Sequence, residues 1–113
     1  MYRTNGSLDA PAFLEGTITQ IDSPDENGTY PTFWGRSVET ETNKKVMVDG
    51  RPRTLYLRYS HLTEDSADDL AVGGKITRGQ TIGTIGKTTR NGPSATMRKH
   101  LDVRGYVLSL IHI

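Results

Sequence analysis

Two histidines are the residues of this chain that are best suited to chemistry. His61 ends an alternating apolar stretch, and His100 lies in the C-terminal part of the chain. Near neutral pH an imidazole can take up or release a proton, and its free nitrogen can bind a metal ion. The chain has no cysteine, which excludes disulfides, thiolate zinc sites and cysteine nucleophiles. A functional site in this chain would therefore be centred on His61 and His100.

Each of these histidines belongs to a predicted strand. Residues 53–61 are predicted to be a strand because apolar residues alternate along them, and side chains alternate between the two faces of a strand. The residues that share the face of His61 are Leu55, Leu57 and Tyr59. Residues 98–103 are a second predicted strand, which places Arg98, His100 and Asp102 on one face.

Further strands are predicted around these two. They lie at residues 15–22, 33–42, 45–48, 75–78 and 81–85. Asn43-Lys44 is predicted to form a turn, and Asp49-Gly50 is a strong hairpin signal. Residues 64–70 are predicted to form a single helical turn, and residues 87–96 a loop. Since no long segment has helical periodicity, the predicted fold is all-β, a mostly antiparallel β-sandwich or rolled sheet with short loops and little helix.

The composition of the chain limits its class. Its 113 residues amount to one domain, and the 34% hydrophobic content with 12 glycines is typical of a turn-rich β protein. The net charge of +1 favours neither nucleic acid nor an anionic membrane as a partner. No apolar run approaches the roughly 20 residues of a membrane span. The N-terminus lacks the apolar core of a signal peptide, so either the protein is soluble where it is made or its export signal lies outside this sequence.

The last residues differ in character from the rest. Residues 108–113, LSLIHI, form an apolar run that no turn signal ends. They match the in-frame translation of a common sequencing-adapter end. We therefore interpret them as a non-native tail that is not part of the domain. His112 is therefore not a candidate ligand. Residues 1–107 are expected to form a single domain.

Three motifs of the chain resemble those of a known enzyme family. They are a Tyr-x-His-Leu element (Tyr59, His61 and Leu62), the glycine-punctuated segment VGGKITRGQTIGTIG (72–86) and the segment HLDVRG (100–105). The segment APAFLEGTI (10–18) also looks like the start of that family's sheet. Together these motifs resemble the lysostaphin-type zinc metallopeptidases, which cut peptidoglycan cross-bridges and have a duplicated hybrid-motif fold. The resemblance covers about residues 8–106.

The resemblance implies a zinc site and assigns roles to single residues. In this family three protein ligands hold zinc and leave a fourth position for water. His100 matches the zinc-ligand histidine, and His61 matches the catalytic histidine of the Tyr-x-His-Leu element. Arg98 occupies the position of a second catalytic histidine. Because arginine stays protonated, Arg98 can neither act as a base nor bind zinc, although it can stabilise an oxyanion.

The family's other two zinc ligands come from a His-x-x-x-Asp motif that this chain lacks. Asn5 and Asp9 have the spacing of that motif, but Asp9 lies closer to Gly16 than the family pattern requires. The motif is therefore expected upstream of this chain or never to have been present, which makes the chain a truncated and partly degenerate relative. With His100 as the one matched ligand of three, no stable zinc binding is expected.

Each of these features also has a purely structural interpretation. A histidine at a strand end is usually a partly buried polar residue, and the glycines of residues 73–86 can serve only as turn punctuation. Asp102 either orients a ligand histidine or is a solvent-facing edge charge. Phe33 and Trp34 are expected in the core. Basic residues of the C-terminal part, such as Lys87 and Lys99, are expected on a solvated face, because no aromatic residues alternate with them.

Three functions remain open on the sequence. The first is a zinc-dependent peptidoglycan endopeptidase of a bacterium or phage. The second is a catalytically degenerate module that binds the cell wall or activates a partner. The third is a carrier domain, because residues 72–86 also resemble biotinyl and lipoyl domains; it ranks last, since no lysine has the context of a modified lysine. The first two imply peptidoglycan peptides as partners and an extracellular, periplasmic or virion location.

Overall fold

The computed structural model describes residues 3–4 and 7–108, and every regular element within them is a β-strand. The strands are β1 (Arg3–Thr4), β2 (Ser7–Pro11), β3 (Gly16–Asp22), β4 (Arg36–Val48), β5 (Arg51–Leu62), β6 (Lys75–Ile76), β7 (Thr81–Thr84), β8 (Thr88–Thr89), β9 (Gly92–Pro93) and β10 (Asp102–Tyr106). The predicted all-β, antiparallel fold is confirmed. These residues contain no helix that could span a membrane.

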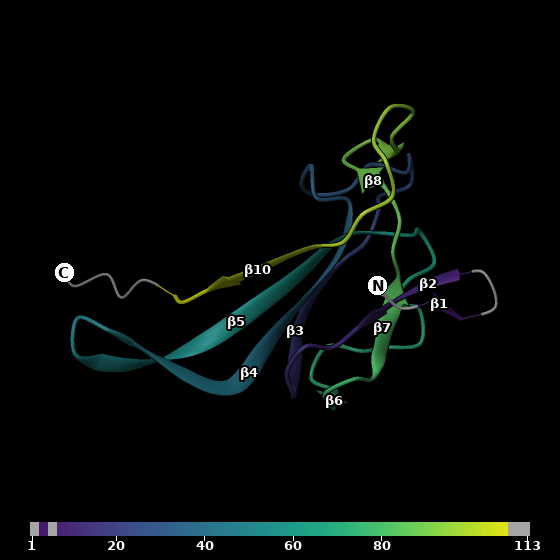
Figure 1. Ribbon diagram of the computed structural model, residues 1–113. Coiled ribbons are helices and arrows are strands. Elements are labelled where there is room, and N and C mark those ends of the chain that lie inside the picture. Colours follow the sequence, from purple (N-terminus) through teal and green to yellow (C-terminus); the bar gives the residue numbers. More distant parts are fainter. Residues whose placement is uncertain (1–2, 5–6, 109–113) are drawn as a thin grey trace.

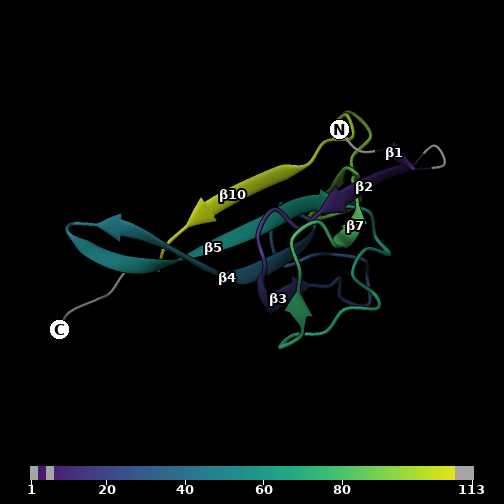
Figure 2. The same ribbon diagram turned by 60° about the horizontal axis from the view of Figure 1, so that its bottom comes forward.

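Two main sheets make up the molecule (Figures 1 and 2). The larger has the strand order β10-β5-β4-β3-β6, and the smaller has the order β1-β2-β7. Among the described strands, β8 and β9 pair only with each other. The long β4–β5 hairpin has one end beside the smaller sheet, while its other end projects away from the rest of the chain (Figure 1). His61 lies near the last residue of β5, at the end of the strand that meets the smaller sheet. His100 lies in the segment just before β10, which pairs with β5.

The core lies between these sheets and is centred on Tyr59 of β5. Tyr59 is fully buried, and its Cα partners on the neighbouring strands are Val38 and Val103. Ile82 of β7 reaches the same cluster from the smaller sheet. The Tyr59 Oη accepts a hydrogen bond of 3.0 Å from the Phe13 N–H. This bond provides a partner for the hydroxyl of a buried tyrosine, which is otherwise costly to desolvate.

The tip of the long hairpin forms as predicted. Asp49 and Gly50 have φ angles of 51° and 77°. Positive φ at both central residues is the signature of the tight hairpin turn whose twist matches that of the flanking strands. Val48 and Arg51 are Cα partners on either side of the turn.

The predicted turn at Asn43-Lys44 is wrong, because β4 runs through these residues as one strand. The pairing of β4 with β5 shifts register between Glu41 and Lys45, which is a β-bulge. Thr42 holds the bulge in place: its Oγ1 donates to the Leu55 carbonyl over 2.7 Å and accepts from the Lys44 N–H over 3.1 Å. The two polar residues that suggested a turn therefore protrude from a continuous strand.

The predicted helical turn at residues 64–70 is also wrong, since the segment forms a series of non-helical turns. Ala67 has a φ of 66°, a left-handed conformation that ends any helix. The buried Arg36 fixes the segment, because its Nε donates to the Ser66 carbonyl over 2.6 Å and its guanidinium pairs with Asp68 over 2.9 Å.

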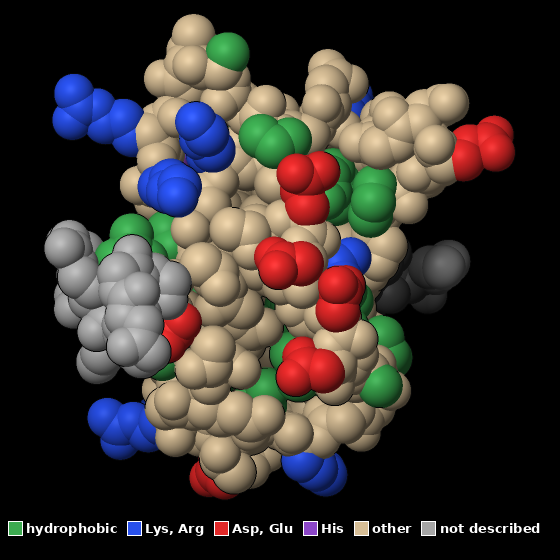
Figure 3. All heavy atoms as spheres, turned by 90° about the vertical axis from the view of Figure 1, so that its right-hand side faces the viewer, with side chains coloured by type: hydrophobic (Ala, Val, Ile, Leu, Met, Phe, Trp, Pro, Cys, Tyr) green, Lys and Arg blue, Asp and Glu red, His purple; other side chains and the backbone are tan. Residues whose placement is uncertain are grey.

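This segment carries much of the acidic surface of the protein. Its exposed acidic residues are Glu64, Asp65, Asp68 and Asp69. Figure 3 shows acidic side chains gathered on the side of the molecule that lies at the right of Figure 1, where the segment runs. The described chain therefore carries a distinctly acidic face, although its net charge is close to zero.

Other expectations need correction in the C-terminal part and in the β3–β4 loop. The segment 87–96, predicted to be a loop, contains the short β8–β9 hairpin, and the strand predicted at 98–103 begins only at Asp102. Phe33 is 59% exposed rather than in the core. Trp34 is half-buried, with the Arg58 guanidinium 5.0 Å from its ring centroid. Of the proposed tail, Leu108 alone lies within the described residues.

Candidate functional site

His61 lies at the end of β5 with its backbone in the left-handed region, at a φ of 60°. Few residues other than glycine adopt this conformation, and those that do are often held there by their surroundings. The His61 N–H donates to the Trp34 carbonyl over 2.9 Å, and the His61 carbonyl accepts from the Gly86 N–H over 3.0 Å. The residue is 5% exposed. Two flanking segments thus fix the backbone that directs the imidazole.

The imidazole of His61 is fixed by a second kind of bond. Its Nδ1 lies 2.7 Å from the Thr88 carbonyl oxygen. Because a carbonyl oxygen can only accept, Nδ1 carries the proton and donates it to this bond. The lone pair of the ring then lies on Nε2, which makes no hydrogen bond to another described residue. Nε2 is the atom of His61 that can accept a proton or bind a metal ion.

Thr88 is itself anchored in the core. Its Oγ1 accepts a hydrogen bond from the Arg36 N–H over 2.9 Å and donates one to the Leu62 carbonyl over 2.6 Å. Gly35 packs against it so closely that a Cβ at that position would lie 2.5 Å from Thr88 atoms. Thr88 therefore holds the His61 ring against a rigid part of the fold, a role that the sequence did not reveal.

His100 is exposed but has a defined orientation. Its N–H donates to the Gly86 carbonyl over 3.0 Å. Its Nδ1 lies 2.9 Å from the Arg98 carbonyl oxygen, so this nitrogen also carries the proton and leaves the lone pair on Nε2. The His61 and His100 ring centroids are 4.9 Å apart at an interplanar angle of 42°. The structure thus brings together the two histidines that the sequence singled out.

Gly86 connects the two histidines through the backbone. It donates to the His61 carbonyl and accepts from the His100 N–H. A Cβ at Gly86 would lie 2.8 Å from the Thr63 nitrogen, closer than real Cβ contacts allow. The close approach of these segments therefore requires glycine, and it gives one of the motif glycines a specific role in the site.

The pair can perform proton transfer. Both rings have Nδ1 held by a carbonyl and Nε2 left with a lone pair. An imidazole held in this way is suited to act as a general base, and as a general acid once protonated. The buried His61 has the more rigid surroundings, while the exposed His100 is the one a ligand from solvent reaches directly.

A cavity of about 170 Å³ opens beside the pair. Its lining includes Gly86 and Thr88, which bond to the histidines, together with three charged residues: Glu64, Lys87 and Lys99. The sequence pointed to none of these three as site residues. The one signal was that Lys99 directly precedes His100. The accessible lining of this cavity is mostly apolar, so it is suited to hold an apolar part of a ligand beside the histidine pair.

The other candidate residues have different places in the structure, and one of them lies outside the described residues. Arg98 is exposed and contributes its carbonyl to the His100 ring. The Asp102 carboxylate accepts from the Arg104 Nε over 3.2 Å, which matches its interpretation as an edge charge. Asp9 lies in β2 opposite Thr84 of β7. Asn5 lies outside the described residues.

The described residues do not complete a zinc site. Residues 3–4 and 7–108 contain no group of three or more His, Cys, Asp or Glu side chains that could hold a metal ion. Zinc hydrolases use three protein ligands. The free Nε2 of His100 is suited to be one of them, but the two imidazoles of the pair are too few.

Comparison with known proteins identifies the fold. No protein-family model matches the chain, and no curated protein sequence matches it. A solved structure does: the catalytic domain of the antimicrobial peptidase lysostaphin from Staphylococcus simulans superposes with a TM-score of 0.60 at 22% sequence identity. The match covers 96% of this chain and 65% of that chain, so this chain spans less than two thirds of its length. The likeness shows that the chain has a lysostaphin-like fold.

Proposed function

We propose that this chain is a lysostaphin-like domain that acts on peptidoglycan peptides at the His61–His100 pair. The observation that carries the proposal is the placement of both motif histidines, 4.9 Å apart, around Gly86 in a lysostaphin-like fold. The rings have the same tautomer, with Nε2 free for proton transfer. The adjacent cavity, which has a mostly apolar lining, can hold a side chain of the peptide.

Each histidine has its own part in this proposal. The Nε2 of His61 takes up or releases a proton, because Thr88 holds its ring in one orientation. His100 faces the solvent and contacts the peptide first. Zinc would supply Lewis acidity and an activated water in the related enzymes. The described residues contain no group of three such ligands, so the proposed role of the pair is proton transfer and peptide binding.

A second candidate is a catalytically degenerate module that binds the cell wall or activates a partner. Two observations favour it: Arg98 stands where a catalytic histidine is expected, and the described metal ligands are incomplete. The endopeptidase and a cell-wall-binding module would both meet peptidoglycan peptides, and an extracellular, periplasmic or virion location is expected for either. They differ in whether the peptide is cut.

Purified peptidoglycan tests the proposal and separates the candidates. We expect the chain to sediment with it, and expect the variants His61→Ala and His100→Ala to bind several-fold more weakly than the control variant His112→Ala, whose histidine belongs to the proposed tail. Release of new amino groups from the peptidoglycan identifies an endopeptidase; binding without release identifies the binding module. Equal sedimentation of all variants, or none by the unmodified chain, contradicts the proposal.

A further inference from the structure

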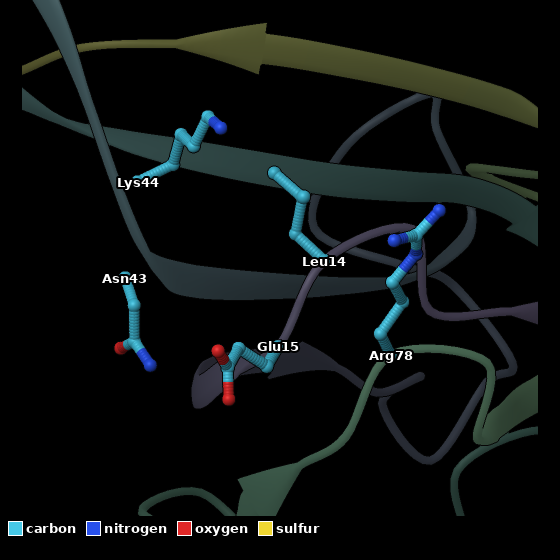
Figure 4. A pocket seen from close by; sticks show the side chains of 5 residues that line it. All are labelled: Leu14, Glu15, Asn43, Lys44 and Arg78. Atoms are coloured by element: carbon cyan, nitrogen blue, oxygen red, sulfur yellow. The ribbon is translucent and has the colours of Figure 1, made fainter.

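A second cavity lies at the β4 bulge, far from the histidine pair. It has a volume of about 390 Å³, within the range of about 300–1,000 Å³ that is typical of small-ligand sites. Figure 4 shows the side chains that line it: Leu14, Glu15, Asn43, Lys44 and Arg78. The bulge bonds to Leu55 of β5, and from Leu55 to His61 the strand runs for about 20 Å. The cavity is therefore a separate site.

Each segment that lines this cavity is held by its own hydrogen bonds. Thr42 fixes the bulge that makes Asn43 and Lys44 protrude. Arg78 lies in a tight turn that is bonded to the β2–β3 connection on both sides: the Gly79 N–H donates to the Ala12 carbonyl, and the Ala12 N–H donates to the Gln80 carbonyl, each over 2.8 Å. Glu15 immediately precedes β3. The backbone of the lining is thus fixed, while its four polar side chains are exposed to solvent. Bulges of this kind often redirect side chains next to ligand sites.

The charges in this lining are not neutralised by one another. Lys44 and Arg78 are cations and Glu15 is an anion, yet none of them forms a salt bridge with another described residue. In Figure 4 the Leu14 side chain stands between Lys44 and Arg78. The lining thus offers two cations and one anion around an apolar side chain. A ligand that carries a negative charge, a positive charge and a small apolar part would be complementary to it.

We propose that this cavity binds the free end of a short peptide or an amino acid as a zwitterion. Lys44 and Arg78 hold its carboxylate, Glu15 accepts hydrogen bonds from its ammonium group, and Leu14 packs against its side chain. The cation excess in the lining favours the carboxylate as the main anchor. This cavity would have a different function from the His61–His100 pair, because binding of the zwitterion requires no proton transfer and no metal.

Three related dipeptides test this assignment by NMR. The probes are alanyl-alanine, its C-terminal amide and its N-acetyl derivative, each added up to about 10 mM because ligands of this size bind weakly. We expect alanyl-alanine to shift the backbone amide signals of Glu15, Asn43, Lys44 and Arg78. The amide lacks the carboxylate and is expected to bind at least about tenfold more weakly, in line with the loss of a charge-assisted hydrogen bond. The N-acetyl derivative is expected to bind between the two.

Matched variants locate the site. Lys44→Gln and Arg78→Gln are expected to weaken alanyl-alanine binding about tenfold each, whereas Lys75→Gln, an exposed cation outside the lining, is expected to leave it unchanged. Glu15→Gln is expected to abolish the preference for alanyl-alanine over its N-acetyl derivative. The proposal is overturned if no signal shifts, if the amide binds as well as the acid, or if the shifts cluster around His61. The result is independent of peptidoglycan hydrolysis, so the two proposals fail separately.

Discussion

His61 and His100 lie with their ring centroids 4.9 Å apart, and Gly86 bonds to the backbone of both. A single glycine thus connects the backbones of the two histidines. Its N–H donates to the His61 carbonyl and its carbonyl accepts from the His100 N–H. The space around its Cα has no room for a side chain.

Replacement of Gly86 by alanine is expected to disturb the pair. The added Cβ would lie 2.8 Å from the Thr63 nitrogen, and a forced shift of this kind costs about 1–3 kcal/mol of unfolding free energy. Urea unfolding, followed by the fluorescence of the single tryptophan Trp34, measures the loss. Gly105→Ala is the control, since its Cβ would lie 3.3 and 3.5 Å from the ends of the Leu55 and Leu57 side chains and 3.9 Å from the Tyr56 carbonyl oxygen, with no contact under 3.0 Å. Equal losses in the two variants would count against a special role of Gly86.

Thr88→Val is expected to destabilise the protein through its hydroxyl. Valine keeps the shape but leaves the Arg36 N–H and the Leu62 carbonyl without their partner. Each buried group left unpaired costs about 1–3 kcal/mol. Thr88→Ser keeps the hydroxyl and is expected to lose less, so the difference between the two unfolding free energies measures the bonds. A serine variant as unstable as the valine variant contradicts this account.

The buried ion pairs on the outer face of the large sheet are expected to matter more than the exposed one. Arg58 pairs with Asp22 and Glu39 at 3.2 Å each, and Asp22 is 3% exposed. Arg58→Met leaves a buried carboxylate without its cation, which costs about 3–5 kcal/mol. Arg104→Met, which breaks the exposed pair with Asp102, is expected to cost well under about 1 kcal/mol. Denaturation of both variants gives the comparison, and a reversed order would refute it.

Stability is expected to fall in strongly alkaline solution because of Tyr59. Burial raises the pKa of Tyr59, and the N–H groups of Phe13 and Leu14 offset part of this rise. A tyrosine whose pKa is higher in the folded than in the unfolded state stabilises the fold fully below the unfolded value of about 10, and this contribution is lost as the pH rises through the folded pKa. Unfolding free energies between pH 8 and 11 should therefore decline for the parent chain, and less steeply for Tyr59→Phe. Identical slopes would remove Tyr59 as the cause.

Stable zinc binding by this chain is not expected, because the described residues supply too few ligands. Equilibrium dialysis against buffered zinc, followed by metal analysis, measures it. One tightly bound zinc per chain that disappears in His100→Ala would contradict the prediction.

The sequence predicted the parts of this structure that depend on local pattern. Alternation along β5 predicted the strand that ends in His61, and Asp49-Gly50 predicted the hairpin tip, because both signals act within a few residues. The bulge at Asn43-Lys44 was mistaken for a turn, since only the bond from Thr42 to the distant Leu55 distinguishes the two. Such long-range bonds leave no mark in a single sequence.

In the candidate site, too, the features set by local sequence pattern were predicted and those set by long-range contacts were missed. The motif residues His61 and His100 were identified from sequence and lie together. Thr88, which holds the His61 ring, was missed because its role depends on contacts with Arg36 and Leu62 that the fold alone creates. Asp102 was left open between two roles, and its bond to Arg104 favours the edge charge.

The most direct test of the proposed function follows the imidazole signals of the histidines by NMR while soluble peptidoglycan fragments are added. Variants His61→Gln, His100→Gln and His112→Gln assign the three signals. We predict that the His61 and His100 signals move together over the same range of fragment concentration while the His112 signal stays in place. If the His61 and His100 signals stay in place, or if one moves without the other, the pair is not the site at which this chain meets peptidoglycan.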